Sequence, residues 1–140
     1  MSDLDDLNPF NRQIVEEFRA NGGKVGGPFE GAPVLVLHST GARSGQERLA
    51  PVVYQDLGDR WAIFASKAGA DTNPDWYHNL VAQPEASIEI GTERLPVTAR
   101  VLDDAERQPI WDAQKSAMPG FAEYEAKTVR TIPVVVLERR

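Results

Sequence analysis

The sequence predicts an α+β protein built on a small barrel of about six mainly antiparallel strands with flanking helices. Three observations predict this fold. Short apolar runs rich in β-branched residues recur along the chain, separated by turn signals such as Gly58-Asp59 and Gly91-Thr92. These runs do not alternate with helical patterns, which excludes a classical nucleotide-binding fold. The last run, 132–137, is continuously apolar and is therefore expected to lie centrally in the sheet.

The first predicted element is a helix over residues 9–21, which follows an acidic leader, 1–8. Asn8-Pro9 supplies an N-cap and a proline at the first helical position, and Gly22-Gly23 ends the helix. We expect its apolar face to pack on the sheet, because a helix that binds a membrane surface usually has a strongly basic face. That face comprises Phe10, Ile14, Val15 and Phe18.

The remaining elements follow from the same signals. A helix is expected over 73–82, with Asn73 as N-cap and Pro74 at its first position. Asp103 opens another helix, toward Met118, in a capping-box arrangement, and Pro109 should kink that helix or delay its start. A short helical segment is expected over 121–127. Strands are predicted at 34–38, 49–57, 60–66, 86–90, 95–102 and 132–137.

Composition limits the possible functions. The 140 residues show no linker or repeat, so 1–140 reads as one domain. With 15 Lys+Arg against 21 Asp+Glu, the net charge is −6, which argues against nucleic acid as a partner. There is no cysteine, and no apolar run approaches ~18 residues, which argues against membrane association. The acidic N-terminus lacks the basic start of a secretory signal, and the predicted location is the cytoplasm.

The most informative polar stretch is the loop 39–48, which joins two predicted strands. Gly41 and Gly45 allow positive φ, so backbone N–H groups can turn inward. Ser44 adds a hydroxyl, and Arg43 and Arg48 add guanidinium groups. This set suits a phosphate or a carboxylate. The alternative interpretation is a polar hairpin turn with two solvated arginines.

Two further polar clusters follow at 65–69 and 73–79. A strand end, a glycine turn and a helix N-terminus in succession make a good opening for a ligand. Trp76 and Tyr77 could stack on a planar ring, although core packing explains them equally, and Lys67 could be a solvated charge. His38 and His78 form no metal-ligand pair, and His38 is expected in a strand, either satisfied or at an edge. No metal is therefore predicted, and no nucleophile-elbow or Walker motif occurs.

Taken in order, these clusters resemble the deazaflavin-dependent nitroreductase family. The resemblance covers about 34–137, and the ordered set is more specific than any one motif. It implies a split β-barrel, similar to flavin reductases and pyridoxamine-phosphate oxidases, and coenzyme F-420 as the ligand. The residues that carry it are Thr40-Gly41-Ala42-Arg43-Ser44-Gly45, Arg48, Pro51, Ala65-Ser66-Lys67, Gly69, Asn73-Pro74, Trp76-Tyr77, Asn79-Leu80 and Arg130-Thr131-Ile132-Pro133-Val134.

The resemblance also implies roles for individual residues. The anionic tail of the coenzyme would be held at the loop 39–48, and the deazaflavin and its ribityl chain at the strand end 64–67. Tyr124 would donate a hydrogen bond to the acceptor, and Ser66 would orient the ring or the substrate. The implied cofactor-binding residues are Ala42, Arg43, Ser44, Arg48, Pro51, Val52, Val53, Phe64, Ala65, Ser66, Lys67, Asp75, Trp76, Tyr77, His78, Asn79 and Met118.

The implied activity is transfer of a hydride from reduced coenzyme F-420 to a planar electrophile: a quinone, an enone or a nitroaromatic. Many family members carry a basic residue where Ala42 stands, and the best-known nitro-reducing branch carries a tyrosine where Phe121 stands. The second departure argues against reduction of bicyclic nitro compounds. Two alternatives stay open: a non-catalytic binding protein of the same fold, and an enzyme that uses flavin mononucleotide (FMN). The protein is expected to be a monomer or a homodimer.

Overall fold

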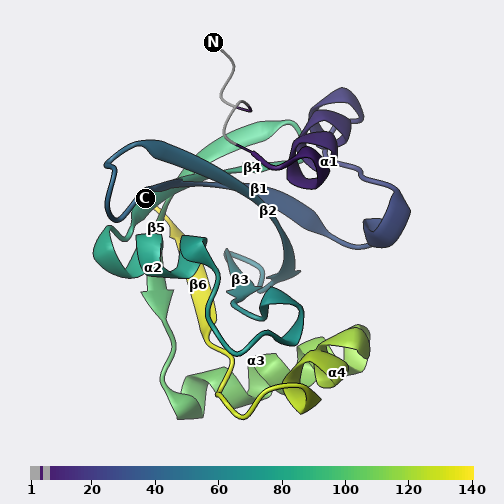
Figure 1. Cartoon of the computed structure of the whole chain (residues 1–140), viewed down its shortest axis with the longest axis vertical. Helices are drawn as coiled ribbons and strands as arrows, with labels where there is room; N and C mark the ends of the chain where they lie inside the picture. The colour runs from purple at the N-terminus through teal and green to yellow at the C-terminus, as the bar shows by residue number, and fades with distance from the viewer. Residues whose placement is uncertain (1–3, 5–6) are drawn as a thin grey trace.

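The computed structural model describes Leu4 and residues 7–140, so most of the predicted leader lies outside the described residues. Six strands form a closed antiparallel barrel in the order β1-β2-β3-β6-β5-β4 (Figure 1). The predicted fold class is confirmed, and the C-terminal strand lies between β3 and β5, as its continuous apolar run predicts. The strands are β1 (Val34–Thr40), β2 (Glu47–Asp56), β3 (Arg60–Phe64), β4 (Glu85–Ile90), β5 (Glu93–Val101) and β6 (Val134–Arg139).

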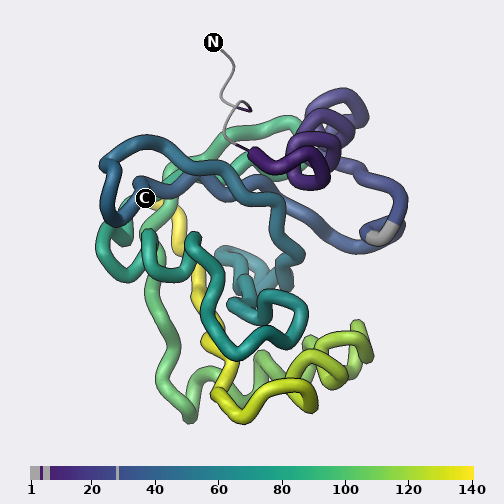
Figure 2. Tube along the Cα trace, in the orientation of Figure 1, coloured from purple at the N-terminus to yellow at the C-terminus, as the bar shows by residue number. Residues whose placement is uncertain are grey.

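The helices lie outside the barrel and at its end. Figure 1 shows one helix against β1 and β2 at one side, and two helices together at the opposite side. The trace in Figure 2 follows the chain from the first helix, through the barrel, to the last strand. The helices are α1 (Pro9–Ala20), η1 (Gly27–Phe29), η2 (Lys67–Gly69), α2 (Asp75–Ala82), α3 (Asp104–Ala117) and α4 (Gly120–Ala126), of which η1 and η2 are single 3₁₀ turns.

Strand alternation divides the core into three clusters. Leu35 and Leu37 of β1 point into the barrel, whereas Val34 and Val36 pack under α1. Both sets are buried, so β1 is apolar on both faces. The third cluster lies between the barrel and the layer of α3 and α4. From α2, Trp76 and Leu80 join the cluster inside the barrel.

In the N-terminal helix the predicted cap is confirmed, but Phe10 does not lie on the buried face as predicted. Asn8 caps α1, since its Oδ1 accepts a hydrogen bond from Asn11 N at 2.7 Å. Ile14, Val15 and Phe18 are buried as predicted. Phe10 is 50% exposed instead, because its ring lies at the margin of the cluster, where its centroid is 6.1 Å from that of Phe29.

The predicted cap of α2 is wrong. The helix begins at Asp75 with the extended Pro74 as its N-cap residue, so Pro74 is not the first helical residue. Asn73 lies one residue before the cap position, and its Oδ1 accepts a hydrogen bond from Arg130 Nη1 at 2.7 Å instead of one from the helix. The cap at Asp103 is confirmed, with Glu106 N donating to Asp103 Oδ1 at 2.8 Å, and α3 continues through Pro109.

Candidate functional site

The tip of the β1–β2 hairpin is fixed to α2 by one side-chain amide. Asn79, which is buried, accepts a hydrogen bond at Oδ1 from Ala42 N (2.9 Å) and donates one from Nδ2 to Ser39 Oγ (3.3 Å). Two predicted site residues from separate motifs, Ala42 and Asn79, are therefore in direct contact. The tip cannot swing freely relative to the helix.

The tip presents cationic groups around a serine hydroxyl. Ser44 Oγ accepts hydrogen bonds from Gln46 N (3.2 Å) and Arg48 Nη2 (3.4 Å). A Cβ at Gly41 would lie 2.5 Å from that hydroxyl, so a larger residue there would displace the Ser44 side chain; of the two glycines expected to have positive φ, only Gly45 does, at 70°. Arg43 is exposed and Arg48 is half-buried. These groups, carried on a braced turn, suit an anionic ligand.

A left-handed segment follows β3. Lys67, Ala68 and Gly69 have φ values of 47°, 54° and 85°, and the preceding Ser66 is right-handed helical. A right-handed residue followed by a left-handed one turns successive N–H groups toward one concave side, which favours electron-rich ligand atoms. Positive φ in two non-glycine residues costs free energy, and such strain clusters at ligand-binding sites. The chain leaves the extended conformation at Ser66, which is right-handed helical, so β3 ends at Phe64 rather than at the predicted position 66.

Arg130 holds this segment in place. It is not among the predicted site residues. Its guanidinium donates to the carbonyl oxygens of Ala65 (3.0 Å), Ser66 (3.1 Å) and Ala70 (2.9 Å), as well as to Asn73. Burial lowers the pKa of Arg130, and the charge of Asp71 opposes that effect. The group stays protonated because an arginine pKa begins so high. The only sequence signal for Arg130 was its place in the last motif of the resemblance.

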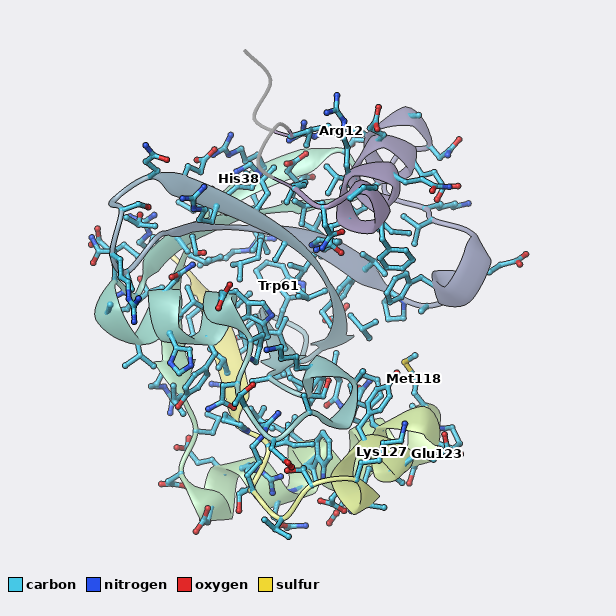
Figure 3. The ribbon with its side chains drawn as sticks, viewed as in Figure 1. Arg12, His38, Trp61, Met118, Glu123 and Lys127 are labelled. Atoms are coloured by element: carbon cyan, nitrogen blue, oxygen red, sulfur yellow. The ribbon has the colours of Figure 1, made fainter. Side chains whose placement is uncertain are left out.

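An aromatic wall borders the left-handed segment. The ring centroids of Phe64 and Phe121 lie 5.6 Å apart, and those of Phe121 and Tyr124 5.3 Å apart. A Cβ on Gly69 would lie 2.9 Å from the backbone oxygen of Tyr124, so the segment packs directly on α4. Met118 packs on the same cluster, and Figure 3 shows it on the helical layer with Lys127. The structure thus brings the elements that carry Ser66 and Tyr124 together.

Other predicted residues are dispersed. Val52 packs inside the barrel, whereas Val53 packs in the clusters outside it, so these neighbours cannot line one surface. Trp76 belongs to the core inside the barrel and is 9% exposed. Asp75 and His78 are exposed on α2. In α2, a ligand at the surface would therefore meet the polar residues more readily than Trp76.

Two cavities among the described residues are large enough to hold a small molecule. One, of 310 Å³, is bordered by α1 and the β4–β5 turn and includes Arg19 and Glu89. The other, of 530 Å³, lies between residues 30–33, β2 and α3, and Met118 is the only predicted site residue that lines it. Within the described part of the chain, no three His, Cys, Asp or Glu side chains are grouped so that they could hold a metal ion.

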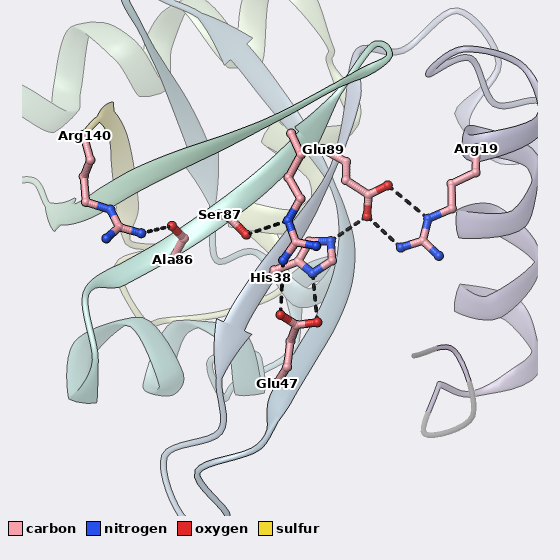
Figure 4. Close-up of polar contacts among 8 residues, drawn as sticks. Arg19, His38, Glu47, Ala86, Ser87, Glu89 and Arg140 are labelled. Atoms are coloured by element: carbon pink, nitrogen blue, oxygen red, sulfur yellow. Dashed lines mark hydrogen bonds and ion pairs between the residues drawn. The ribbon is translucent and has the colours of Figure 1, made fainter. Parts of the chain in front are cut away.

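A second polar network joins α1, β1, β2 and β4 (Figure 4). His38 in β1 is buried, with Nε2 2.5 Å from Glu89 Oε2, while Nδ1 lies 3.2 Å from Glu47 Oε1 without a hydrogen-bond partner among the described residues. Arg19 of α1 binds Glu89 at 2.8 and 3.0 Å. Burial alone would raise the pKa of Glu89, but hydrogen bonds from Arg19 and His38 outweigh it and hold that pKa below its usual value. The network attaches α1 to the barrel.

The closed barrel, with a braced cationic turn and a left-handed turn beside aromatic rings, is a split β-barrel of the pyridoxamine-phosphate-oxidase-like class. A family model described as F420H(2)-dependent quinone reductase matches residues 10–139, and the chain belongs to this family. The resemblance to deazaflavin-dependent enzymes is thereby confirmed, with a quinone reductase rather than a nitroreductase description.

Similar proteins agree with this assignment. An F420H(2)-dependent quinone reductase of Mycobacterium tuberculosis (strain H37Rv) is 39% identical over 127 residues, which cover 88% of this chain and 85% of that protein. A solved F420-H2 dependent reductase (FDR-A) is 39% identical with a TM-score of 0.70, covering 76% of this chain and 94% of the other. A solved domain-swapped dimer is 35% identical with a TM-score of 0.72, covering 92% and 97%.

Proposed function

We propose that this protein is an oxidoreductase that uses reduced coenzyme F-420 to reduce a quinone. One observation supports this most strongly: the chain carries both a cationic hairpin tip, which Asn79 holds to α2, and a left-handed turn of N–H groups that aromatic rings border. A coenzyme with an anionic tail and a planar ring system needs these two kinds of contact. FMN has a single phosphate and would therefore make fewer ionic contacts with the arginines of the tip.

The residues present suit the coenzyme. Arg43, Ser44 and Arg48 would hold its phosphate and glutamate tail, and the N–H groups at 66–68 would face the electron-rich edge of the ring. When bound, the coenzyme supplies a hydride, and the quinone takes up this hydride and one proton to become a hydroquinone.

The chain contributes position and charge stabilisation. Arg130 keeps the segment 65–70 in one conformation, which restricts where a bound ring can lie. Tyr124 would donate a hydrogen bond to the acceptor oxygen as negative charge develops there, and the hydroxyl of Ser66 would orient the ring or the acceptor. The aromatic wall keeps water from one side of the acceptor.

The test is oxidation of reduced coenzyme F-420 by the purified protein, followed by absorbance with and without a naphthoquinone. We expect oxidation that depends on both protein and quinone. Tight coenzyme binding without quinone-dependent oxidation would favour a binding protein, and preferential binding of FMN would favour a flavin enzyme. Either result would overturn the proposal.

The oligomeric state and the cytoplasmic location stay predictions. Among the described residues, no helix combines the length and the apolar composition that crossing a bilayer requires.

A further inference from the structure

The 530 Å³ cavity has a shape and chemistry that the coenzyme does not account for. It is lined by Glu30, Gly31, Ala32, Pro33, Tyr54, Gln55, Asp56, Ala113, Gln114, Ala117 and Met118. Its volume falls within the range of roughly 300–1,000 Å³ that small-molecule sites occupy. Most of the surface that it exposes is apolar.

The charges around the cavity exclude the anionic tail of the coenzyme. Glu30 and Asp56 line it, and none of the described residues that line it is Lys or Arg. An anion there would meet two carboxylates without a compensating cation. Desolvation by burial and the charge of Asp56 raise the pKa of Tyr54, so its hydroxyl stays neutral at physiological pH.

The two amide side chains in the wall already have partners. Gln55 Nε2 donates to Ile110 O (3.1 Å) and to Gln114 Oε1 (3.2 Å), and Gln114 Nε2 donates to Met118 Sδ (3.4 Å). These amide donors are therefore engaged within the protein. An apolar ligand would leave those bonds intact and would gain from burial of its carbon surface.

The cavity meets the proposed reaction site at one residue. Met118 lines the cavity and also packs on the cluster that contains Phe121 and Tyr124. A flexible thioether side chain suits such a junction, because it can adjust to ligands of different shape. Resting on the proposed function, we propose that this cavity binds the alkyl or isoprenoid chain of the quinone, while the quinone ring lies beside Tyr124.

Two kinetic and two binding measurements test this proposal. Ala113→Phe and Ala117→Phe place a ring in the cavity from exposed positions of α3, and Ala105→Phe is the matched control on the same helix away from the cavity. We expect the cavity variants to raise KM about tenfold for a naphthoquinone that carries an isoprenoid chain. KM for a chainless naphthoquinone and the Kd for the coenzyme should stay unchanged. In parallel, farnesol should bind to the wild type and to Ala105→Phe, but not to Ala113→Phe.

The outcomes separate the two proposals. Reduction of both quinones with no selective change in KM, or farnesol binding that Ala113→Phe retains, would overturn the cavity assignment and leave the proposed function in place. Absence of reduction with either quinone, together with farnesol binding that Ala113→Phe abolishes, would overturn the proposed function while the cavity would remain a site for apolar chains.

Discussion

The hairpin tip and the left-handed segment after β3 flank the same proposed site, but they are built in opposite ways. The tip continues a regular hairpin whose register runs from Val34↔Val53 to Thr40↔Glu47, and it carries exposed charge. The segment at 67–69 has positive φ at every residue and depends on Arg130, which lies some 60 residues further along the chain. A flexible ionic tail can bind to exposed, solvated charges, whereas a ring that must meet an acceptor requires fixed geometry. The comparison predicts that changes to the segment will cost more than changes to the tip.

The largest effect is expected from Arg130→Met. It removes four hydrogen bonds from one cation, three of them to backbone carbonyls of the strained segment. We expect the free energy of unfolding to fall by about 3 kcal/mol and kcat to fall more than about a hundredfold. Arg130→Lys should recover only part of the loss, because an ammonium cannot reproduce the planar set of donors. Arg60→Met removes a half-buried arginine of β3 whose ion pairs, at 3.9 and 4.0 Å, are long, and it serves as the control in both assays. Full activity in Arg130→Met would contradict the positioning role.

Tyr124→Phe tests the chemistry beside the segment without disturbing the wall. The ring remains to pack against Phe121, and only the hydroxyl is lost. We expect kcat for the quinone to fall about a hundredfold, with the Kd of the coenzyme unchanged. Steady-state kinetics and a coenzyme titration measure the two quantities separately. Weaker coenzyme binding with normal kcat would remove Tyr124 from the proposed role.

Gly69→Ala separates strain from close packing. At Gly69, φ is +85° and a Cβ would lie 2.9 Å from both Lys127 Cβ and Tyr124 O. Gly58 has a similar φ of +99° but nothing within 4 Å of its Cβ position, so Gly58→Ala is the matched control. We expect a loss of about 1 kcal/mol for Gly58→Ala and about 2–3 kcal/mol for Gly69→Ala in chemical denaturation. Equal losses would show that the approach to α4 is not tight.

Charge removal at the tip should have a smaller effect. Arg43→Ala and Arg48→Ala should each weaken coenzyme binding about threefold at low salt, since exposed ion pairs contribute little. The difference from the wild type should shrink as the salt concentration rises, because screening already weakens the wild-type contacts. Isothermal titration at two ionic strengths measures this, with Arg60→Ala as the control. Unchanged binding in the double variant would place the tail elsewhere.

The last effect is on stability alone and concerns the network of Arg19, His38 and Glu89. The folded-state pKa of Glu89 lies below its usual 4.5, so the ionised form stabilises the fold above that pH. That contribution is lost as the pH falls through the lower folded-state pKa. Glu89→Gln should therefore cost about 1 kcal/mol at pH 7 and progressively less below pH 4.5, as measured by denaturation across this range. A pH-independent difference would contradict the assignment, and coenzyme binding should not change.

The strands and the hairpin tip could be predicted from the sequence better than the left-handed segment could. Periodic apolar runs predict six strands because strand alternation and burial act locally, and β6 shows the two-faced burial that its composition indicates. The contact of Ala42 with Asn79 joins residues that the sequence analysis had already placed in one site. Positive φ at Lys67 and Ala68 could not be predicted, since local preference opposes it in both residue types.

The predicted N-cap of α2 is wrong for a similar reason, because a contact that is distant in the sequence overrides the local preference. Asn73 has the preferred residue type for an N-cap, but a distant guanidinium occupies its oxygen. The different sides of Val52 and Val53 follow from strand alternation, which the resemblance to a family does not take into account. When a family motif lies in a strand, the face to which each side chain points must be known before its residues can be assigned to one binding surface.

The way in which the barrel closes also affects when the protein can fold during its synthesis. β6 pairs with β3 through partners as distant in sequence as Arg60 and Glu138, and it pairs with β5 on its other side. While the ribosome is still making residues 134–139, β3 and β5 each lack a neighbour and expose strand edges on which other chains can pair. A barrel that β6 closes cannot finish folding before residues 134–139 emerge from the ribosome, so the nascent protein depends on fast pairing of β6 or on chaperones during that interval.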